Sequence, residues 1–235
     1  TIEGDASGNG VLTFNSTGAT IVDLGNSTID DAGANGTSDV TYSGIETIRV
    51  AGGTQAVTVE GTSVDETMTV TPVAGSRVFV ASDQAVALVD VTTSGTFTVD
   101  PLGGQDTVRV LTTAGNDTLD VTNTTVDLTT PNWISVTYTT ANTEQLTIET
   151  GTGNDTIRVA AGVTTPLFID AGGPTDGDTI HLTAATGATI TQGATSTSGV
   201  IDGFSDGSAD VSYANVEAIQ VVSSAAASKI GRAHV

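Results

Sequence analysis

Acidic residues recur at one place in this sequence, directly before a Thr or Ala and an apolar-x-apolar stretch. Seven such motifs begin at Glu46, Glu66, Asp106, Asp117, Asp155, Asp178 and Glu217. Most of the aspartates closely follow glycine, whose backbone carbonyl, like a carboxylate, offers oxygen as a ligand atom. Calcium prefers several such oxygens, and a chain without Cys has no thiolate for a softer metal. The motifs therefore predict weak calcium binding.

The predicted metal ligands are five aspartates: Asp155, Asp176, Asp178, Asp106 and Asp117. Asp155 lies in the most complete Gly-rich motif, and Asp176 and Asp178, with Asp170 nearby, form the densest local group of acids. The same residue types also suit a tight turn. Gly and Asn accept positive φ, and Asp side chains accept hydrogen bonds from nearby N–H groups. A calcium ligand and a turn former stay open as alternatives for each aspartate.

A carbohydrate-active β-helix enzyme, a glycosidase or a polysaccharide lyase, is the alternative function. Inverting and retaining glycosidases need two carboxylates about 5 to 9.5 Å apart. The candidates are Asp170, Asp176, Asp178 and His181. Each belongs to a repeated position and not to a loop that occurs once, so we expect no catalytic residue and no hydrolase or lyase activity.

Short strands must carry these residues, because apolar-x-apolar stretches recur about every ten residues and leave no space for a helix. Alternation predicts which side chains face the core: Ile48, Val50, Val108, Val110, Ile157, Val159, Ile180 and Leu182. Between them, the outward positions are Arg49, Arg109, Arg158 and His181, which with acids on neighbouring rungs form a charge-balancing face. Stacked units of this length predict a parallel β-solenoid with about 20 residues per coil.

A second similarity has a much longer period. Tyr42, Tyr138 and Tyr213 each precede a Glu-containing strand, and the tyrosines lie 96 and 75 residues apart. A repeat of this size is typical of a whole small domain. It keeps tandem antiparallel β-sandwiches open as the alternative all-β fold.

Charge limits the partners of the chain. The 235 residues carry a formal charge of −21, whereas a nucleic-acid partner requires clustered Lys and Arg. The longest apolar run, Ala85 to Val89, is far shorter than the roughly 20 residues that span a bilayer. We expect no nucleic acid and no membrane insertion. Divalent cations, cell-surface polysaccharide and neighbouring repeats of the same chain are the expected partners.

Several segments resemble a known repeat family: Gly151-Thr-Gly-Asn-Asp155-Thr-Ile157, Gly103-Gly-Gln-Asp106-Thr-Val108, Gly115-Asn-Asp117-Thr-Leu119 and Gly172-Gly-Pro-Thr-Asp176-Gly-Asp178-Thr-Ile180. They are similar to degenerate forms of the Gly-Gly-x-Gly-x-Asp-x-apolar-x nonapeptide of RTX-type calcium-binding repeats. The Tyr, Glu and Gly-Asn-Asp-Thr order is similar to repeat regions of large hemolysin-type and adhesin-like bacterial proteins. The resemblance implies a secreted or cell-surface protein whose Asp carboxylates and Gly carbonyls hold calcium between coils.

Two segments follow from these patterns. Residues 1–224 are expected to form the repetitive β-solenoid, and residues 225–235 form a tail of different composition that resembles translated adapter sequence. The expected function is a non-catalytic structural or adhesive segment of an extracellular or cell-surface protein. We expect the chain to be an internal piece of a longer one.

Overall fold

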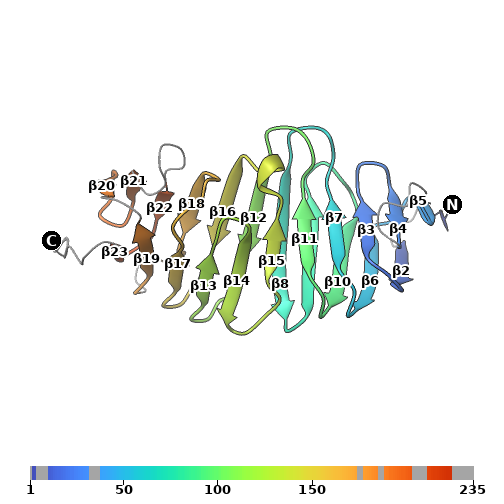
Figure 1. The fold of residues 1–235 in the computed structure, drawn as a ribbon, viewed down its shortest axis with the longest axis horizontal. Helices are drawn as coiled ribbons and strands as arrows, with labels where there is room; N and C mark the ends of the chain where they lie inside the picture. The colour runs from blue at the N-terminus through green and yellow to red at the C-terminus, as the bar shows by residue number, and fades with distance from the viewer. Residues whose placement is uncertain are drawn as a thin grey trace. The chain divides into compact units, whose positions relative to one another are not determined.

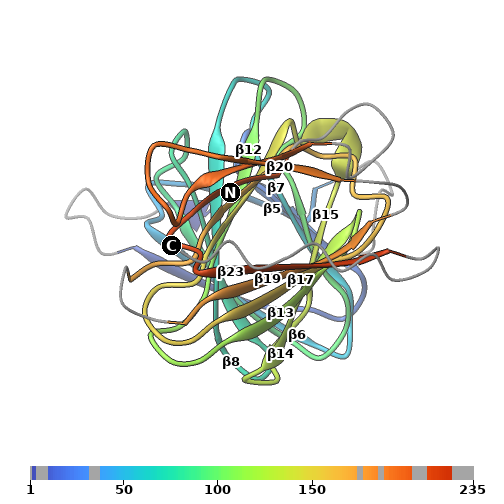
Figure 2. The ribbon, with the colours of Figure 1, turned by 90° about the vertical axis from the view of Figure 1, so that its left-hand side faces the viewer.

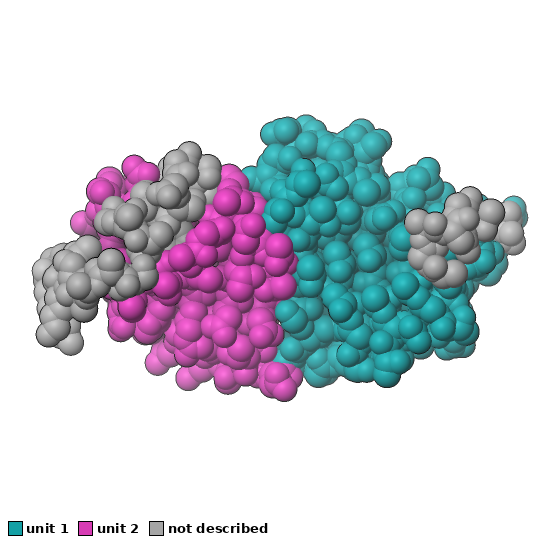
Figure 3. Space-filling model, in the orientation of Figure 1, with its two compact units in different colours: residues 1–109, 133–144 teal, residues 110–132, 145–235 magenta. Residues whose placement is uncertain are grey.

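The computed structural model describes residues 2–3, 10–31, 38–173, 177–184, 188–202 and 211–223. The tail predicted at residues 225–235 lies outside these ranges. Within them the regular structure is all β apart from one 3-10 turn, η1 (Thr140–Asn142), and no helix is long and apolar enough to cross a membrane. The chain divides into two compact units, residues 1–109 with 133–144 and residues 110–132 with 145–235, which Figure 3 shows in different colours.

Unit 1 contains strands of two sheets (Figure 1). In spatial order, the first has β1 (Ile2–Glu3), β5 (Val40–Ser43), β4 (Thr28–Asp30), β3 (Thr20–Asp23), β7 (Val57–Glu60), β11 (Phe97–Asp100) and β15 (Val136–Tyr138). The second has β2 (Val11–Asn15), β6 (Thr47–Gly53), β10 (Leu88–Thr93), β9 (Arg77–Ser82) and β8 (Thr67–Ala74). Strand β12 (Thr107–Leu111) contains the division between the units.

Unit 2 is built in the same way. Its first set of strands is β14 (Thr125–Thr130), β13 (Thr118–Val121), β17 (Thr156–Val159), β19 (Thr179–Ala184) and β23 (Ala218–Ser223). Its second set is β16 (Gln145–Glu149), β18 (Leu167–Asp170), β22 (Val211–Ala214), β21 (Gly199–Asp202) and β20 (Thr189–Gln192).

Strands of successive coils pair in parallel. Val57 of β7 pairs with Phe97 of β11 in unit 1, and Thr118 of β13 pairs with Thr156 of β17 in unit 2. Figure 2 shows β13, β17, β19 and β23 of unit 2 lying one behind another. Each unit is therefore a β-solenoid of stacked parallel coils, which confirms the predicted fold class.

The alternation that predicts the core is confirmed. The eight side chains expected inside are 0 to 1% exposed: Ile48, Val50, Val108, Val110, Ile157, Val159, Ile180 and Leu182. The outward positions between them, Arg49, Arg109, Arg158 and His181, are half-buried or exposed. At about 25 cal/mol per Å² of apolar surface removed from water, this interior is the main source of stability.

The predicted coil length of about 20 residues is wrong for most coils. Hydrogen-bonded equivalents lie 40 residues apart at Glu66 and Asp106, and 38 apart at Asp117 and Asp155. The separation falls to 23 residues only between Asp155 and Asp178 among these acids. The strand spacing of about ten residues holds, but most coils contain about four strands and not two.

Antiparallel meanders account for the extra length. Among the described strands, β3-β4-β5, β8-β9-β10 and β20-β21-β22 each pass to a rung further along the stack and return through antiparallel strands, and β13 likewise pairs antiparallel with β14. Tyr42 and Tyr213 lie in the returning strands β5 and β22, and both are buried. The long-period similarity thus marks returning strands and not separate sandwich domains.

Candidate functional site

The motif acids of unit 2 form a ladder between coils. The backbone N–H of Asp117 donates to the carboxylate of Asp155 at 2.8 Å, and the N–H of Asp155 donates to the carboxylate of Asp178 at 2.7 Å. The N–H of Asp178 donates to the carboxylate of Glu217 at 2.9 Å. We call Asp117, Asp155, Asp178 and Glu217 the unit 2 ladder. The carboxylates of Asp155, Asp178 and Glu217 each bind the preceding coil.

The residue after each acid donates a backbone hydrogen bond to the carbonyl of the acid in the preceding coil. Thr156 N–H donates to the carbonyl of Asp117 at 2.8 Å, and Thr179 N–H donates to the carbonyl of Asp155 at 2.9 Å. Each step of the ladder is therefore a closed pair, with one side-chain bond and one backbone bond between the same two coils. This pairing sets the register of the parallel strands that follow, which explains why the acid directly precedes each strand.

Three of the four carboxylates lie inside the protein, whereas Glu217 is exposed. Asp155 and Asp178 are 0% exposed and Asp117 is 1% exposed. A buried charge is costly unless hydrogen bonds compensate for lost water. At the first position of the ladder, Asp117 accepts from the Thr112 hydroxyl at 2.5 Å and from the Thr113 N–H and hydroxyl at 2.8 Å each. Local threonines thus compensate the carboxylate that has no acid before it in the ladder.

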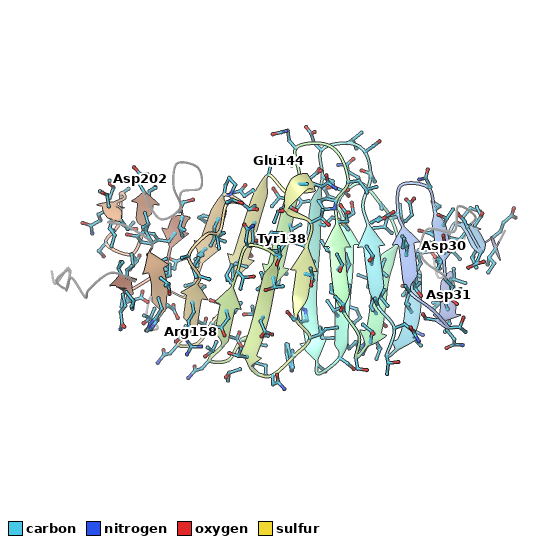
Figure 4. All side chains as sticks on the ribbon, in the orientation of Figure 1. Asp30, Asp31, Tyr138, Glu144, Arg158 and Asp202 are labelled. Carbon is cyan, nitrogen blue, oxygen red and sulfur yellow. The ribbon has the colours of Figure 1, made fainter. Side chains whose placement is uncertain are left out.

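Unit 1 repeats the arrangement. Glu66 N–H donates to the carboxylate of Asp106 at 2.8 Å, and Asp106 N–H donates to the carboxylate of Glu144, labelled in Figure 4, at 2.6 Å. The carboxylate of Glu66 accepts from the Thr62 N–H and the Ser82 hydroxyl. We call Glu66, Asp106 and Glu144 the unit 1 ladder.

The side chain of the asparagine in the Gly-Asn-Asp motif binds the following coil, on the side opposite to the coil that the aspartate binds. Asn154 N–H donates to the side-chain oxygen of Asn116 at 2.9 Å, and the side-chain oxygen of Asn154 accepts from Gly177 N–H at 2.9 Å. The Asp155 carboxylate binds the coil before, whereas the Asn154 amide oxygen binds the coil after. Gly153 has φ +136°, and a Cβ there would lie 2.5 Å from the carbonyl oxygen of Gly115. Only glycine fits this close approach of two coils.

The predicted calcium ligands can now be placed. Asp117, Asp155 and Asp178 come together in the unit 2 ladder and Asp106 lies in the unit 1 ladder, while Asp176 lies outside the described residues. Within the described ranges, no group of three or more Asp, Glu or His side chains is placed to hold a metal ion. Asp106, Asp155 and Asp178 accept amide hydrogen bonds from the preceding coil, so they do more than form turns, whereas Asp117 accepts from Thr112 and Thr113 nearby in the chain. Calcium binding stays a prediction.

The candidate catalytic residues do not share one surface. Asp178 faces the interior, and His181 lies on the outward side of β19. Asp170, at the end of β18, accepts from Gly172 N–H at 3.1 Å and from the side-chain amide of Asn215 at 2.7 Å. Asp176, the fourth candidate, is not among the described residues. The three that are described form no pair of acids facing a common space.

The predicted charge-balancing face is present. Arg158, labelled in Figure 4, lies 3.4 Å from Asp120 on the neighbouring strand, and both side chains are about half exposed. Arg49 lies 3.7 Å from Asp90, which also accepts two hydrogen bonds of 2.8 Å from Arg77. An exposed pair such as Arg158 and Asp120 contributes roughly 0 to 1 kcal/mol, whereas Asp90 is only 7% exposed.

A further carboxylate, Asp31, holds the connection between β2 and β3 and was not predicted from the sequence. It accepts from Thr17 N–H at 2.9 Å, from the Thr17 hydroxyl at 2.5 Å and from Gly18 N–H at 3.1 Å. Burial, the largest single influence, raises the pKa of Asp31. The hydrogen bonds from Thr17, Gly18 and Thr20 together outweigh burial and lower that pKa to about 2.

Three outward acids occupy one row of unit 1. Asp23 pairs with Glu60, and Glu60 pairs with Asp100, at the ends of β3, β7 and β11. Neighbouring strands lie about 4.8 Å apart, so the three carboxylates are close. Burial, then the charges of Asp23 and Asp100, raise the pKa of Glu60. The sequence signal was an acid closing each of the stretches Thr20-Ile-Val-Asp23, Val57-Thr-Val-Glu60 and Phe97-Thr-Val-Asp100.

Besides Glu66, the ladder residues that the site prediction missed are Glu144 and Glu217. Each stands a few residues after a Tyr of the long-period similarity, and each returns a backbone bond, to Asp106 at 3.0 Å and to Asp178 at 3.2 Å. The Tyr-to-Glu spacing was the signal that could have identified them. Comparison with the models of known protein families finds no match for this chain, and neither does a search of curated proteins.

Proposed function

We propose that this chain is a non-catalytic structural or adhesive repeat segment of an extracellular or cell-surface protein. The single observation that carries the proposal is the use of the motif acids. In the unit 2 ladder, the carboxylates that are the most obvious candidates for chemistry are 0 to 1% exposed at Asp117, Asp155 and Asp178, and each accepts a hydrogen bond. Asp155 and Asp178 join neighbouring coils, and the burial of all three carboxylates supports a structural role.

The outer surface supports the same proposal. The outward rows carry threonines, isolated ion pairs and acids, as in the row of Thr58, Thr98 and Thr137. A net charge of −21 keeps such a surface soluble and suits cations or neutral glycans as partners. The likeness of the motifs to RTX-type repeats supports an extracellular location. Calcium is not required for the proposal.

The direct test is an activity screen with a folding control. The purified chain is incubated with a panel of cell-wall and extracellular polysaccharides, and reducing ends and unsaturated products are measured. We expect no turnover by the wild type. Turnover that Asp178→Asn abolishes, while circular dichroism shows the variant still folded, would overturn the proposal in favour of the enzyme alternative.

Binding without turnover is the positive expectation. Co-sedimentation with the same insoluble polysaccharides distinguishes an adhesive segment, which is depleted from the supernatant, from a spacer, which is not. Arg158→Ala and Arg49→Ala test whether the outward face makes the contact, because both side chains are more than half exposed. Ile157→Ala is unsuitable for this purpose, since it changes the core.

A further inference from the structure

The last two strands of unit 2 are each paired on one side. β23 ends one set of strands, where it pairs with β19, and β20 ends the other set, where it pairs with β21. Among the described residues, no strand pairs with the outer side of either one. Figure 2 looks onto this end of the unit, with β20 above β23. A free strand edge presents N–H and C=O groups to any strand that can reach it.

The apolar core is incompletely covered at this end. Ile219 and Val221 of β23 face inward, because their partners on β19 are 0% exposed, yet both are half-buried. Ile190 of β20 is 36% exposed, although its partner on β21 is also 0% exposed. Both sets of strands therefore present inward apolar side chains that a further layer of strands would remove from water.

The two edge strands carry no charged residue and no proline. β20 reads Thr-Ile-Thr-Gln and β23 reads Ala-Ile-Gln-Val-Val-Ser, in a chain with a formal charge of −21. Natural proteins commonly protect free edges with charged side chains, proline or bulges. Like charges directly opposite each other destabilise a strand pair. These edges have neither a protecting charge nor a charge that would oppose pairing with a second copy.

We propose that this end of unit 2 is an interface between two copies of the chain, in which β23 pairs antiparallel with β23 of the partner subunit and β20 with β20 of the partner subunit. One two-fold axis that passes through both sets of strands forms both pairs. A second copy presents the same two edges at the same separation, whereas a single extended peptide covers only one of them. Two-fold contacts are the commonest form of homo-oligomer. The dimer goes beyond the proposed function and does not depend on it.

Alternation fixes the register of the β23 pair. The register centred on Gln220 sets Ile219 opposite Val221 of the partner subunit, so every inward side chain has an inward partner. Registers centred on Ile219 or Val221 leave one of these side chains without an apolar partner. The central register also separates Glu217, which precedes β23, from Glu217 of the partner subunit by six residues along the pair. That is about 20 Å at about 3.4 Å per residue.

The test measures the molar mass of the full chain by sedimentation equilibrium over a wide range of concentration. We expect the wild type to rise from 23.4 kDa toward twice that value. Val221→Lys and Ile190→Lys each place a charge on one edge strand, and each should raise the dissociation constant of the dimer by about tenfold or more. Circular dichroism checks the fold of each variant. Ile190→Lys stays informative even if Val221→Lys fails to fold, because β20 is exposed along its whole length.

Thr183→Lys is the matched control. It adds the same charge at an exposed position of β19, which is already paired on both sides. It should change the dissociation constant by less than about twofold.

A second readout tests the symmetry. The chain has no Cys, so Gln220→Cys introduces a single thiol. In the proposed register the two introduced thiols face each other across the two-fold axis, with Cβ atoms about 4.5 to 5.5 Å apart, close to the separation that a disulfide needs. Oxidised glutathione should convert Gln220→Cys to a covalent dimer and leave Thr183→Cys without one.

Four results would overturn the proposal. The wild type stays at 23.4 kDa at every concentration; its mass grows beyond the dimer in an open series, which indicates head-to-tail association; neither lysine at the edges weakens the dimer; or Gln220→Cys and Thr183→Cys cross-link equally. A dimer that both edge lysines weaken, and that Gln220→Cys locks covalently, supports the two-fold interface.

Discussion

The backbone N–H of Asp117 is bound by the carboxylate of Asp155, 38 residues later in the chain, at 2.8 Å. The side chain thus binds an amide of the preceding coil at the point where the parallel strands begin. Asp155→Ala leaves the Asp117 N–H buried without this acceptor. We expect a loss of about 1 to 3 kcal/mol in the free energy of unfolding, measured by urea denaturation.

Asp120→Ala is the control for that substitution. Asp120 lies on β13 and is about half exposed, and its partner is Arg158 at 3.4 Å. Its removal should change the free energy of unfolding by no more than about 1 kcal/mol. Equal losses in the two variants would show that the ladder contributes no more than a surface ion pair.

Two valines of unit 1 test the solenoid core. Val59 is 0% exposed on β7, and Val86 is 87% exposed between β9 and β10. Val59→Ala should lower the free energy of unfolding by about 1.5 to 3 kcal/mol, while Val86→Ala should leave it nearly unchanged. A comparable loss at Val86 would contradict its exposed position.

Asp31 should make the fold sensitive to strong acid. Its pKa is lowered to about 2, so the stabilisation is present above the unfolded value of about 3.8 and is lost as pH falls from there toward 2. The thermal midpoint of the wild type should therefore fall steeply in this window, and that of Asp31→Asn less steeply. Parallel curves for the two proteins would exclude the role of the Thr17 and Gly18 donors.

Ionisation of Glu60 should lower the stability of the fold, whereas ionisation of Asp31 raises it. Its pKa is raised by burial and by Asp23 and Asp100, so its contribution to stability falls as pH rises above the ordinary value of about 4.3. Glu60→Gln should raise the thermal midpoint at neutral pH by about 1 to 3 °C, and added NaCl should reduce the difference. A lower midpoint for Glu60→Gln would show that the carboxylate makes a favourable contact.

Calcium can be tested against sodium at matched ionic strength. Asp155 and Asp178 are buried and already accept amide bonds, whereas calcium requires six to eight oxygens, so a site would need further oxygens. The calcium prediction expects a larger rise of the thermal midpoint in millimolar calcium than in sodium, and equal rises would indicate screening of the negative charge alone. A larger rise in millimolar calcium that Asp155→Asn removes would support the calcium prediction made from the sequence.

Strand positions and the core could be predicted from alternation alone, because each strand buries one face and the period of two is visible in Ile157-Arg-Val159. The coil length could not be predicted in this way. Whether strands spaced about ten residues apart return to the neighbouring rung or pass further along the stack depends on long-range pairing, such as that of β8 with β9 and of β9 with β10. The tyrosines of the returning strands were visible as a long repeat, but their meaning required the topology.

The sequence motif identified residues of the ladders but not the bonds that their side chains make. The motif identified Asp106, Asp117, Asp155 and Asp178 correctly as a recurring set. It did not show that the carboxylates of Asp106, Asp155 and Asp178 accept from amides of the preceding coil, because the donor of the Asp155 bond, for example, lies 38 residues away. Spacing within a motif describes local geometry, whereas the donors come from the stacking of coils.

The opposite directions of Asn154 and Asp155 bear on how such a chain can lengthen during evolution. A segment running from one Gly-Asn-Asp motif to the next carries an acceptor for the coil before it and an acceptor for the coil after it. Tandem duplication of that segment therefore inserts a coil whose donors and acceptors match on both sides. The gene can gain or lose whole coils while the protein keeps its fold, and the step of 23 residues from Asp155 to Asp178 keeps the same bond between coils.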